Sequence, residues 1–144
     1  MLSYEDRVAI DALLAGYAFA FDSGDGEAFA DLFTPDGSFD NVGVATMTGR
    51  QELVEFVKER YAQAPGVRHF TANVLVEADG DGARARAYVW VIRLGGDGPL
   101  RLRNTGEYRD VFVRTDAGWR FARRTFSSWV GAELVDAPFA FGAA

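Results

Sequence analysis

Residues 67–78 read VRHFTANVLVEA, and at this stretch the chain changes from a helical to a two-residue periodicity. Alternation predicts a β-strand with a semi-polar face that begins at His69 and an apolar face that begins at Phe70. The residues that follow keep this periodicity and are rich in β-branched and aromatic side chains. The short connecting loops are rich in Gly and Asp, which favours antiparallel hairpins. We therefore expect three more strands, at about 83–94, 100–114 and 118–131.

The sequence before this stretch has the periodicity of amphipathic helices. Apolar residues between Ile10 and Phe21 recur at the spacing of one helix face. Ser3 can cap the start of this helix, and Gly24 can end it in a left-handed conformation. Asp25 can cap a short second helix, so we expect two helices to open the chain.

A turn, a short strand and a third helix are expected between the second helix and residue 67. Residues 35–37 (Pro-Asp-Gly) have the composition of a turn, and residues 38–44 suit a strand. Thr48 stands three residues before Gln51, which is the spacing of a capping box. The third helix would start there and stop at residues 64–66 (Ala-Pro-Gly).

Helices first and strands after are the order of an α+β fold. We expect a curved, mixed or antiparallel sheet that wraps around about three N-terminal helices and leaves a pocket between sheet and helices. The length suits one domain, so we expect residues 1–144 to fold as a single unit. The small, apolar tail at 132–144 would be either frayed or folded over an opening.

Composition excludes several classes of function. The chain has no Cys, which removes disulfides and thiolate metal sites, and one His, which removes a metal site built from several histidines. The net charge of −6 argues against nucleic acid as a partner. No apolar run is long enough to span a membrane, and the first residues lack the pattern of a signal peptide. We therefore expect a cytoplasmic protein with no membrane partner.

Two residues are the first candidates for chemistry. Histidine titrates near neutral pH, so His69 suits a general acid or base, although a lone histidine is more often structural. Asp22 follows the apolar face of the first helix, where a carboxylate meets the negative end of the helix dipole. A carboxylate at this locally unfavourable position hints at a functional role, although the local sequence alone favours an ordinary, solvated Asp.

Further polar and aromatic side chains are candidates for the same site. The last strand carries Arg123 and Arg124 in succession, and one of them should face the concave side. Arg124 is the candidate that could hold an anionic group there, with a salt-bridged strand arginine as the alternative, and the sequence leaves open which of the two faces inward, because a bulge would exchange them. Tyr17 lies on the apolar face of the first helix, as a core tyrosine or as a hydrogen-bond donor. Five aromatic residues suit the core or a substrate pocket: Tyr88, Trp90, Tyr108, Phe112 and Phe126.

The order of these elements resembles the SnoaL-like branch of the nuclear-transport-factor-2-like (NTF2-like) superfamily. The stretches that carry the resemblance span nearly the whole chain: 17–22, 32–37, Gly49, 67–73, 106–110 and 118–121. The resemblance implies the cone of that superfamily, with a curved sheet around N-terminal helices.

The resemblance also implies an activity. Scytalone dehydratase, bile-acid 7α-dehydratase and lindane dehydrochlorinase in that superfamily use an Asp–His pair, and Asp22 and His69 match its two positions. Arg124 and Tyr17 match an Arg of the dehydrochlorinase and a Tyr of the bile-acid enzyme. The expected function is a cofactor-independent lyase without a metal. His69, oriented by Asp22, would remove a proton from carbon of a small, hydrophobic, probably cyclic substrate, and Arg124 and Tyr17 would stabilise the anion.

Two other functions remain open at this point. The strand at 83–94 carries no second histidine and no acid, so a group that protonates a leaving group is not evident. An isomerase or polyketide cyclase with Asp22 as the base is therefore one alternative, and a non-catalytic ligand-binding or assembly module is another. Relatives often assemble through the outer sheet face, so we expect a homo-oligomer, either a dimer or a trimer.

Overall fold

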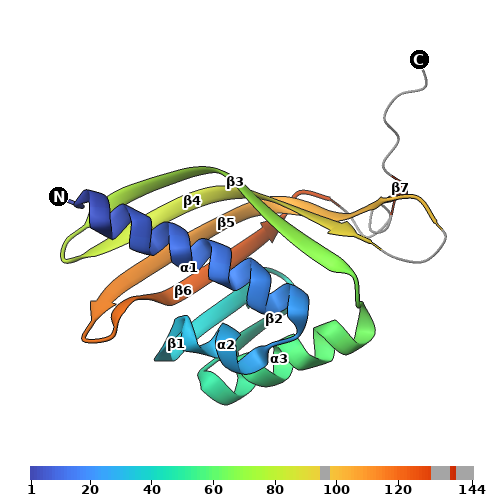
Figure 1. Cartoon of the computed structure of the whole chain (residues 1–144), viewed down its shortest axis with the longest axis horizontal. Helices are drawn as coiled ribbons and strands as arrows, with labels where there is room; N and C mark the ends of the chain where they lie inside the picture. Colours follow the sequence, from blue (N-terminus) through green and yellow to red (C-terminus); the bar gives the residue numbers. More distant parts are fainter. Residues whose placement is uncertain (95–97, 131–136, 139–144) are drawn as a thin grey trace.

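The computed structural model describes residues 1–94, 98–130 and 137–138 (Figure 1). Helices open the chain and long strands follow. The elements run in the order α1 (Tyr4–Ser23), α2 (Gly26–Asp31), β1 (Phe33–Asn41), β2 (Ala45–Thr48), α3 (Arg50–Gln63), β3 (Val67–Asp79), β4 (Gly82–Arg93), β5 (Arg101–Thr115), β6 (Gly118–Ser128) and β7 (Ala137–Pro138). Apart from β7, the tail expected at 132–144 lies outside the described residues.

All the described strands belong to one sheet. Its order is β2-β1-β6-β5-β4-β3, and β7 pairs with β5. Neighbouring strands are antiparallel except β1 and β6, which are parallel, so the sheet is mixed. The sheet curves, α1 crosses its inner face, and α2 and α3 lie together beside β1 and β2 (Figure 1). The α+β class and the curved sheet around three helices, expected from the sequence, are confirmed.

The first helix presents one buried face to the sheet. The side chain of Ser3 accepts a hydrogen bond from the backbone N–H of Asp6 (3.1 Å), and the Asp6 carboxylate accepts one from Ser3 N–H (3.0 Å). This capping box starts the helix, as its spacing predicts. Gly24 ends it with φ 73°, and a Cβ at that position would lie 2.6 Å from the ring of Tyr61. Tyr17 lies on the buried face and is 1% exposed.

The region between α2 and α3 differs from expectation in two places. Residues 35–37 lie within β1, where the pairing with β6 shifts between Phe33 and Ser38, and do not form a separate turn. The expected capping box of Thr48 is also wrong, because Gly49 with φ 82° caps α3 without a side-chain hydrogen bond. The backbone N–H of Thr48 instead donates a hydrogen bond to the side-chain carboxylate of Glu52 at 2.8 Å.

A bulge in β3 interrupts the alternation expected across residues 67–78. The register with β4 shifts between Ala72 and Leu75, and Asn73 adopts a φ of 54°. Because a bulge changes which face the following residues occupy, Leu75 is 55% exposed and does not share the inner face with His69. The bulge leaves the orientation of His69 unchanged, since it comes after that residue.

A second bulge, in β6, decides which arginine faces inward. Phe121 pairs with Phe112 and Arg123 pairs with Val111, so Ala122 is the extra residue. Phe121 and Arg124 are both fully buried, although strict alternation would separate them. Arg123 is exposed on the opposite face. Without the bulge the charged side chain of Arg124 would point to solvent.

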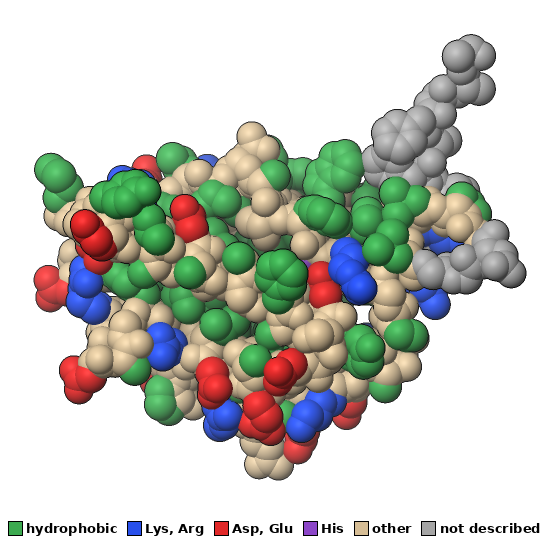
Figure 2. All heavy atoms as spheres, in the orientation of Figure 1, with side chains coloured by type: hydrophobic (Ala, Val, Ile, Leu, Met, Phe, Trp, Pro, Cys, Tyr) green, Lys and Arg blue, Asp and Glu red, His purple; other side chains and the backbone are tan. Residues whose placement is uncertain are grey.

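Charged side chains gather at the end of the molecule formed by α2 and α3 (Figure 2). Several of them form ion pairs: Arg50 lies 2.9 Å from Glu27, and Lys58 lies 3.5 Å from the same carboxylate. Within the described part of the chain, no helix is long and apolar enough to cross a membrane.

Candidate active site

Asp22 and His69, which are 47 positions apart in the chain, meet at the end of α1. The Nδ1 atom of His69 lies 2.6 Å from Oδ1 of Asp22, and the backbone N–H of His69 donates to Oδ2 at 2.9 Å. The side chains are only 7% and 11% exposed, respectively. Asp22 therefore holds both the backbone and the ring of the same residue.

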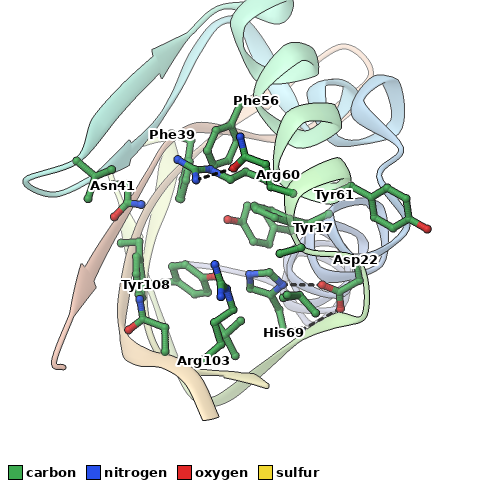
Figure 3. A pocket seen from close by; sticks show the side chains of 18 residues that line it. Tyr17, Asp22, Phe39, Asn41, Phe56, Arg60, Tyr61, His69, Arg103 and Tyr108 are labelled. Carbon is green, nitrogen blue, oxygen red and sulfur yellow. Dashed lines mark hydrogen bonds and ion pairs between the residues drawn. The ribbon is translucent and has the colours of Figure 1, made fainter. Parts of the chain in front are cut away.

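This geometry fixes the tautomer of the imidazole. A carboxylate can only accept hydrogen bonds, so the ring nitrogen that faces it must carry a proton. The neutral ring then has its proton on Nδ1 and its lone pair on Nε2. The free nitrogen of His69 points into the pocket, away from Asp22 (Figure 3). The two donors of His69 also offset the unfavourable position of a carboxylate at a helix C-terminus.

The pocket that contains the pair has a volume of about 370 Å³, which suits a small organic ligand. It lies between α1, α3 and the inner face of the sheet, and its walls are mainly aromatic and aliphatic. Five of the nine residues singled out from the sequence line it: Tyr17, Asp22, His69, Tyr108 and Phe126.

Three aromatic residues expected in the pocket lie elsewhere. Tyr88 and Trp90 are 44% and 48% exposed on the outer face of the sheet, because the inward positions of β4 are taken by Ala87, Val89 and their neighbours. Phe112 is 1% exposed and packs in the core against Phe121, with ring centroids 4.8 Å apart. The pocket assignment of these three residues was therefore wrong.

Of the two arginines between which the sequence could not decide, Arg124 faces the interior, but it does not line the pocket. It is fully buried and forms two hydrogen bonds to Asp110, from Nε at 2.8 Å and from Nη2 at 2.9 Å. Its guanidinium carbon lies 4.2 Å from the ring centroid of Tyr17 and 3.8 Å from that of Tyr108. The expectation of direct contact between Arg124 and an anionic group of a substrate is therefore wrong. Arg124 acts on the pocket through the two tyrosine rings that it supports.

The two tyrosines present phenol groups at the inner end of the pocket (Figure 3). The hydroxyl of Tyr17 is buried and makes no hydrogen bond of good geometry to any described residue. Burial raises the pKa of Tyr17 well above its ordinary value, and burial raises the pKa of Tyr108 to about 12. Both phenols are therefore protonated at neutral pH and can donate hydrogen bonds.

Sequence reasoning missed five polar residues of the pocket: Asn41, Arg60, Gln63, Arg103 and Asn104. Arg60 looks like any other charged residue on a helix surface, and only the packing of α3 brings it to the pocket. Arg103 and Asn104 are adjacent in β5, where the pairing with β4 shifts between Val91 and Ile92. Alternation along β5 from the inward-facing Tyr108 could have pointed to Asn104, but it places Arg103 on the outer face, and only the register shift brings Arg103 to the pocket.

Among the described residues, no group of three or more His, Asp or Glu side chains is arranged to hold a metal ion. Of the described residues that line the pocket, Asp22 alone has a carboxylate, and both its oxygens already accept hydrogen bonds from His69. What the arrangement provides is an oriented imidazole base, two neutral phenol donors and two guanidinium groups around an apolar cavity.

Comparison with known proteins agrees with this arrangement. The family model described as SnoaL-like domain matches residues 3–125. The chain is 31% identical over 121 residues to the uncharacterized protein Rv2910c of Mycobacterium tuberculosis, covering 83% of this chain and 82% of that protein.

Two solved structures are similar over most of the chain. The protein of unknown function Rv3472 from Mycobacterium tuberculosis has a TM-score of 0.82 and 30% identity, over 91% of this chain and 80% of that one. An NTF2-like protein with a cystatin-like fold from Novosphingobium aromaticivorans has a TM-score of 0.80 and 36% identity, over 90% and 86% of the two chains. The NTF2-like fold expected from the sequence is confirmed, and the chain belongs to the SnoaL-like domain family.

Proposed function

We propose that this protein is a lyase of the dehydratase or dehydrohalogenase type, with His69 as the base that removes a proton from carbon. The observation that carries the proposal is the orientation of the ring: Nδ1 is held 2.6 Å from Asp22, and the other nitrogen faces an apolar pocket. An imidazole held in this way has one lone pair that can accept a proton, and this lone pair is directed at the ligand in the cavity. The SnoaL-like family, within a superfamily that includes dehydratases and isomerases, supports this class of reaction.

The proposed reaction starts with a proton on a carbon next to a carbonyl. Nε2 of His69 takes the proton, and the electron pair of the C–H bond moves to form an enolate. The enolate then re-forms the carbonyl and pushes out a hydroxide or a halide from the neighbouring carbon, which leaves a carbon–carbon double bond. A departing hydroxide takes its proton from the imidazolium and leaves as water. A halide leaves as the anion, and the imidazolium then gives its proton to solvent, so in both cases the enzyme returns to its starting state.

Tyr17 and Tyr108 are the proposed donors to the enolate oxygen. An unsatisfied hydroxyl in a buried site costs about 1–3 kcal/mol, and a ligand oxygen beside Tyr17 would satisfy it. The guanidinium of Arg124 lies against both rings and is held by Asp110, so it positions the phenols and adds positive potential below them. The mechanism uses acid–base chemistry alone and asks for no cofactor.

The aromatic walls of the pocket favour a flat, cyclic substrate. Phe21 lies 4.5 Å from the ring of His69, and Phe39 and Phe56 lie 5.5 Å apart further along the wall. A volume of about 370 Å³ accommodates one or two fused rings.

Carbon deprotonation can be tested without knowledge of the leaving group. A panel of cyclic ketones such as β-tetralone is incubated with the protein in heavy water, and deuterium at the carbon next to the carbonyl is followed by mass spectrometry. We expect catalysed exchange that falls by at least about a hundredfold in His69→Gln, because a general base contributes about 10²–10⁴-fold. The exposed Arg123→Gln variant serves as the control and should keep the wild-type rate. Equal exchange by the wild type and His69→Gln would overturn the proposal.

One observation favours isomerisation as a second candidate. Among the described residues that line the pocket, Asp22 is the single carboxylate and is occupied by His69, so the elimination relies on the His69 imidazolium to reach and protonate a hydroxide on the neighbouring carbon. An isomerisation asks less of the site, because the imidazolium only returns the same proton to another carbon. Product analysis separates the two: loss of water from a β-hydroxy ketone indicates the lyase, and migration of a double bond in a β,γ-unsaturated ketone indicates the isomerase. A ligand-binding module would bind the ketones and leave deuterium exchange at the uncatalysed rate.

A further inference from the structure

Asn104 on β5 lies on the same cross-strand row of the sheet as His69. His69 pairs with Val91 and Val91 pairs with Asn104, so the three residues form one row across β3, β4 and β5. All three line the pocket. Adjacent strands lie about 4.8 Å apart, so the backbones of His69 and Asn104 are about 10 Å apart with Val91 between them. The proton transfer proposed for His69 makes no use of Asn104.

Neighbouring groups fix the orientation of the Asn104 side-chain amide. Its oxygen Oδ1 accepts hydrogen bonds from the Thr105 backbone N–H at 2.8 Å and from Oγ of Ser128 at 2.7 Å. A backbone N–H can only donate, so the atom that faces it must be the amide oxygen and not the nitrogen. The NH₂ group is left without an acceptor among the described residues. Because Asn104 lines the pocket, its NH₂ group can donate to a ligand there.

Polar and apolar positions alternate along the part of β5 that faces the pocket. Asn104 and Tyr108 are four residues apart, so their backbones lie about 13 Å apart along the strand. Gly106 between them has no side chain, and a Cβ there would lie 2.8 Å from the ring of Phe126. Phe126 therefore covers the middle of this surface, and it lines the pocket. The result is an apolar surface with a hydrogen-bond donor at each end.

Both ends call for a hydrogen-bond acceptor on the ligand. The neutral phenol of Tyr108 can donate, and Asn104 offers only its NH₂ group, because the two lone pairs of Oδ1 are already used. A ligand hydroxyl beside Asn104 would find no acceptor there for its own hydrogen. A carbonyl oxygen has no hydrogen to place, so it is the better match.

We propose that the substrate of this pocket is a cyclic ketone with a second carbonyl group at the opposite end of its ring skeleton, bound by the NH₂ group of Asn104. The first carbonyl accepts from Tyr17 and Tyr108, and the rings lie over Phe126. This inference names the substrate class of the site, and it rests on the proposed function for the place of the first carbonyl. It concerns binding, so it is tested without turnover.

The test compares two ligands of nearly the same shape. One is trans-decalin-2,6-dione, and the other is its analogue in which an exocyclic CH₂ group replaces one carbonyl oxygen. Affinities are measured by calorimetry, and the NMR signals of the single histidine report that each ligand occupies the pocket. The quantity of interest is the ratio of the two affinities in each protein. Its change between proteins cancels the different hydration of the two ligands and the two equivalent orientations of the dione.

Asn104→Asp is the most specific variant, because its carboxylate can still accept from Thr105 N–H and Ser128 Oγ and only the donor is lost. We expect the ratio of dione to analogue affinity to fall by at least about fivefold, since one hydrogen bond of this kind changes affinity by about twofold to tenfold and its loss leaves a carbonyl unpaired. Asn104→Leu removes the amide without adding a charge and should lower the ratio as well.

Ser128→Ala is the matched control. It removes one of the two hydrogen bonds to Oδ1 but keeps the NH₂ group, and the Thr105 N–H still fixes the orientation of the amide. The ratio should therefore stay within about twofold of the wild-type value.

Three outcomes would overturn the inference. They are a ratio that Asn104→Asp and Asn104→Leu leave unchanged, a fall of the same size in Ser128→Ala, or no binding of the dione to the wild type at millimolar concentration. The outcome is separable from that of the proposed function. A ratio that depends on Asn104 without deuterium exchange that depends on His69 would support the inference and remove the catalytic proposal, and the reverse result would do the opposite.

Discussion

The buried pair Arg124–Asp110 should be one of the most strongly coupled pairs in the protein. Both side chains are completely buried, face each other across β5 and β6, and form two hydrogen bonds of 2.8 and 2.9 Å. Asp110→Leu would leave a fully buried guanidinium without its partner, and this group cannot lose its proton. Breaking one partner of a buried pair costs about 3–5 kcal/mol, and we expect the free energy of unfolding to fall by that amount.

The reverse change should cost less. Burial raises the pKa of Asp110, so in Arg124→Met the remaining carboxyl can take up a proton and become neutral. In the double variant both charges are absent and the site is filled by apolar groups, an exchange that is often close to neutral. We therefore expect Asp110→Leu/Arg124→Met to be more stable than Asp110→Leu alone.

Urea unfolding followed by tryptophan fluorescence measures the four proteins of this cycle. The control is a second cycle on the exposed pair Arg50–Glu27, where a similar distance of 2.9 Å should give a coupling of about 1 kcal/mol or less. Additive losses at Asp110 and Arg124, so that the double variant loses the sum of the single ones, would refute the reasoning.

Three further predictions concern other parts of the molecule. Hydrogen bonds from the Ser3 backbone N–H and the Trp119 indole hold the pKa of Asp6 well below its usual range. The ionised carboxylate therefore adds to the free energy of unfolding above the unfolded-state pKa of about 4, and this contribution is lost as the pH falls. Thermal unfolding between about pH 5 and pH 2 should show a smaller drop in Tm for Asp6→Asn than for the wild type, and an equal drop would contradict this linkage. Tyr17→Phe removes an unpartnered hydroxyl, so Tm should hold or rise while deuterium exchange falls by about tenfold or more, and unchanged exchange would remove Tyr17 from the proposed site. Phe70 and Trp90 pair on the outer face of the sheet and are 55% and 48% exposed, so we expect the protein to form a homo-oligomer through this face. Trp90→Lys should weaken the assembly, and a monomeric wild type in analytical ultracentrifugation would exclude it.

The architecture was predictable from local patterns. The helix from Ile10 to Phe21, its capping by Ser3 and its end at Gly24 all follow from short-range rules and are present in the structure. The four long strands also lie close to their expected bounds. These features depend on the periodicity of apolar residues and on the residue types at turns and caps, and both are evident from neighbouring positions of the sequence.

The orientation of individual side chains was harder to predict, because bulges shift the alternation. The bulge at Asn73 turns Leu75 outward, and the one at Ala122 turns Arg124 inward. Tyr88 and Trp90 were misplaced for a different reason. Aromatic residues suggest burial, but alternation in β4 gives its inner face to small residues such as Ala87, which leaves room for the helices.

Some residues of the candidate site could be predicted from the sequence and others could not. Asp22 and His69 were linked through resemblance to a family, and the structure brings them within 2.6 Å. Arg60 and Arg103 had no such signal, because nothing local distinguishes an arginine that reaches a pocket from one that reaches solvent. The position of Arg60 depends on how α3 packs beside the sheet, and that of Arg103 on the register shift in β5.

The tautomer of His69 tests the central claim most directly, and the chain has no other histidine to confuse the spectrum. Heteronuclear NMR of the neutral imidazole should show the proton on Nδ1 and a free lone pair on Nε2. Asp22→Asn should reverse this, because the amide oxygen must accept from the His69 backbone N–H, which turns the NH₂ group toward Nδ1. A proton on Nε2 in the wild type, or a tautomer that ignores Asp22→Asn, would contradict the account of His69 as an oriented base.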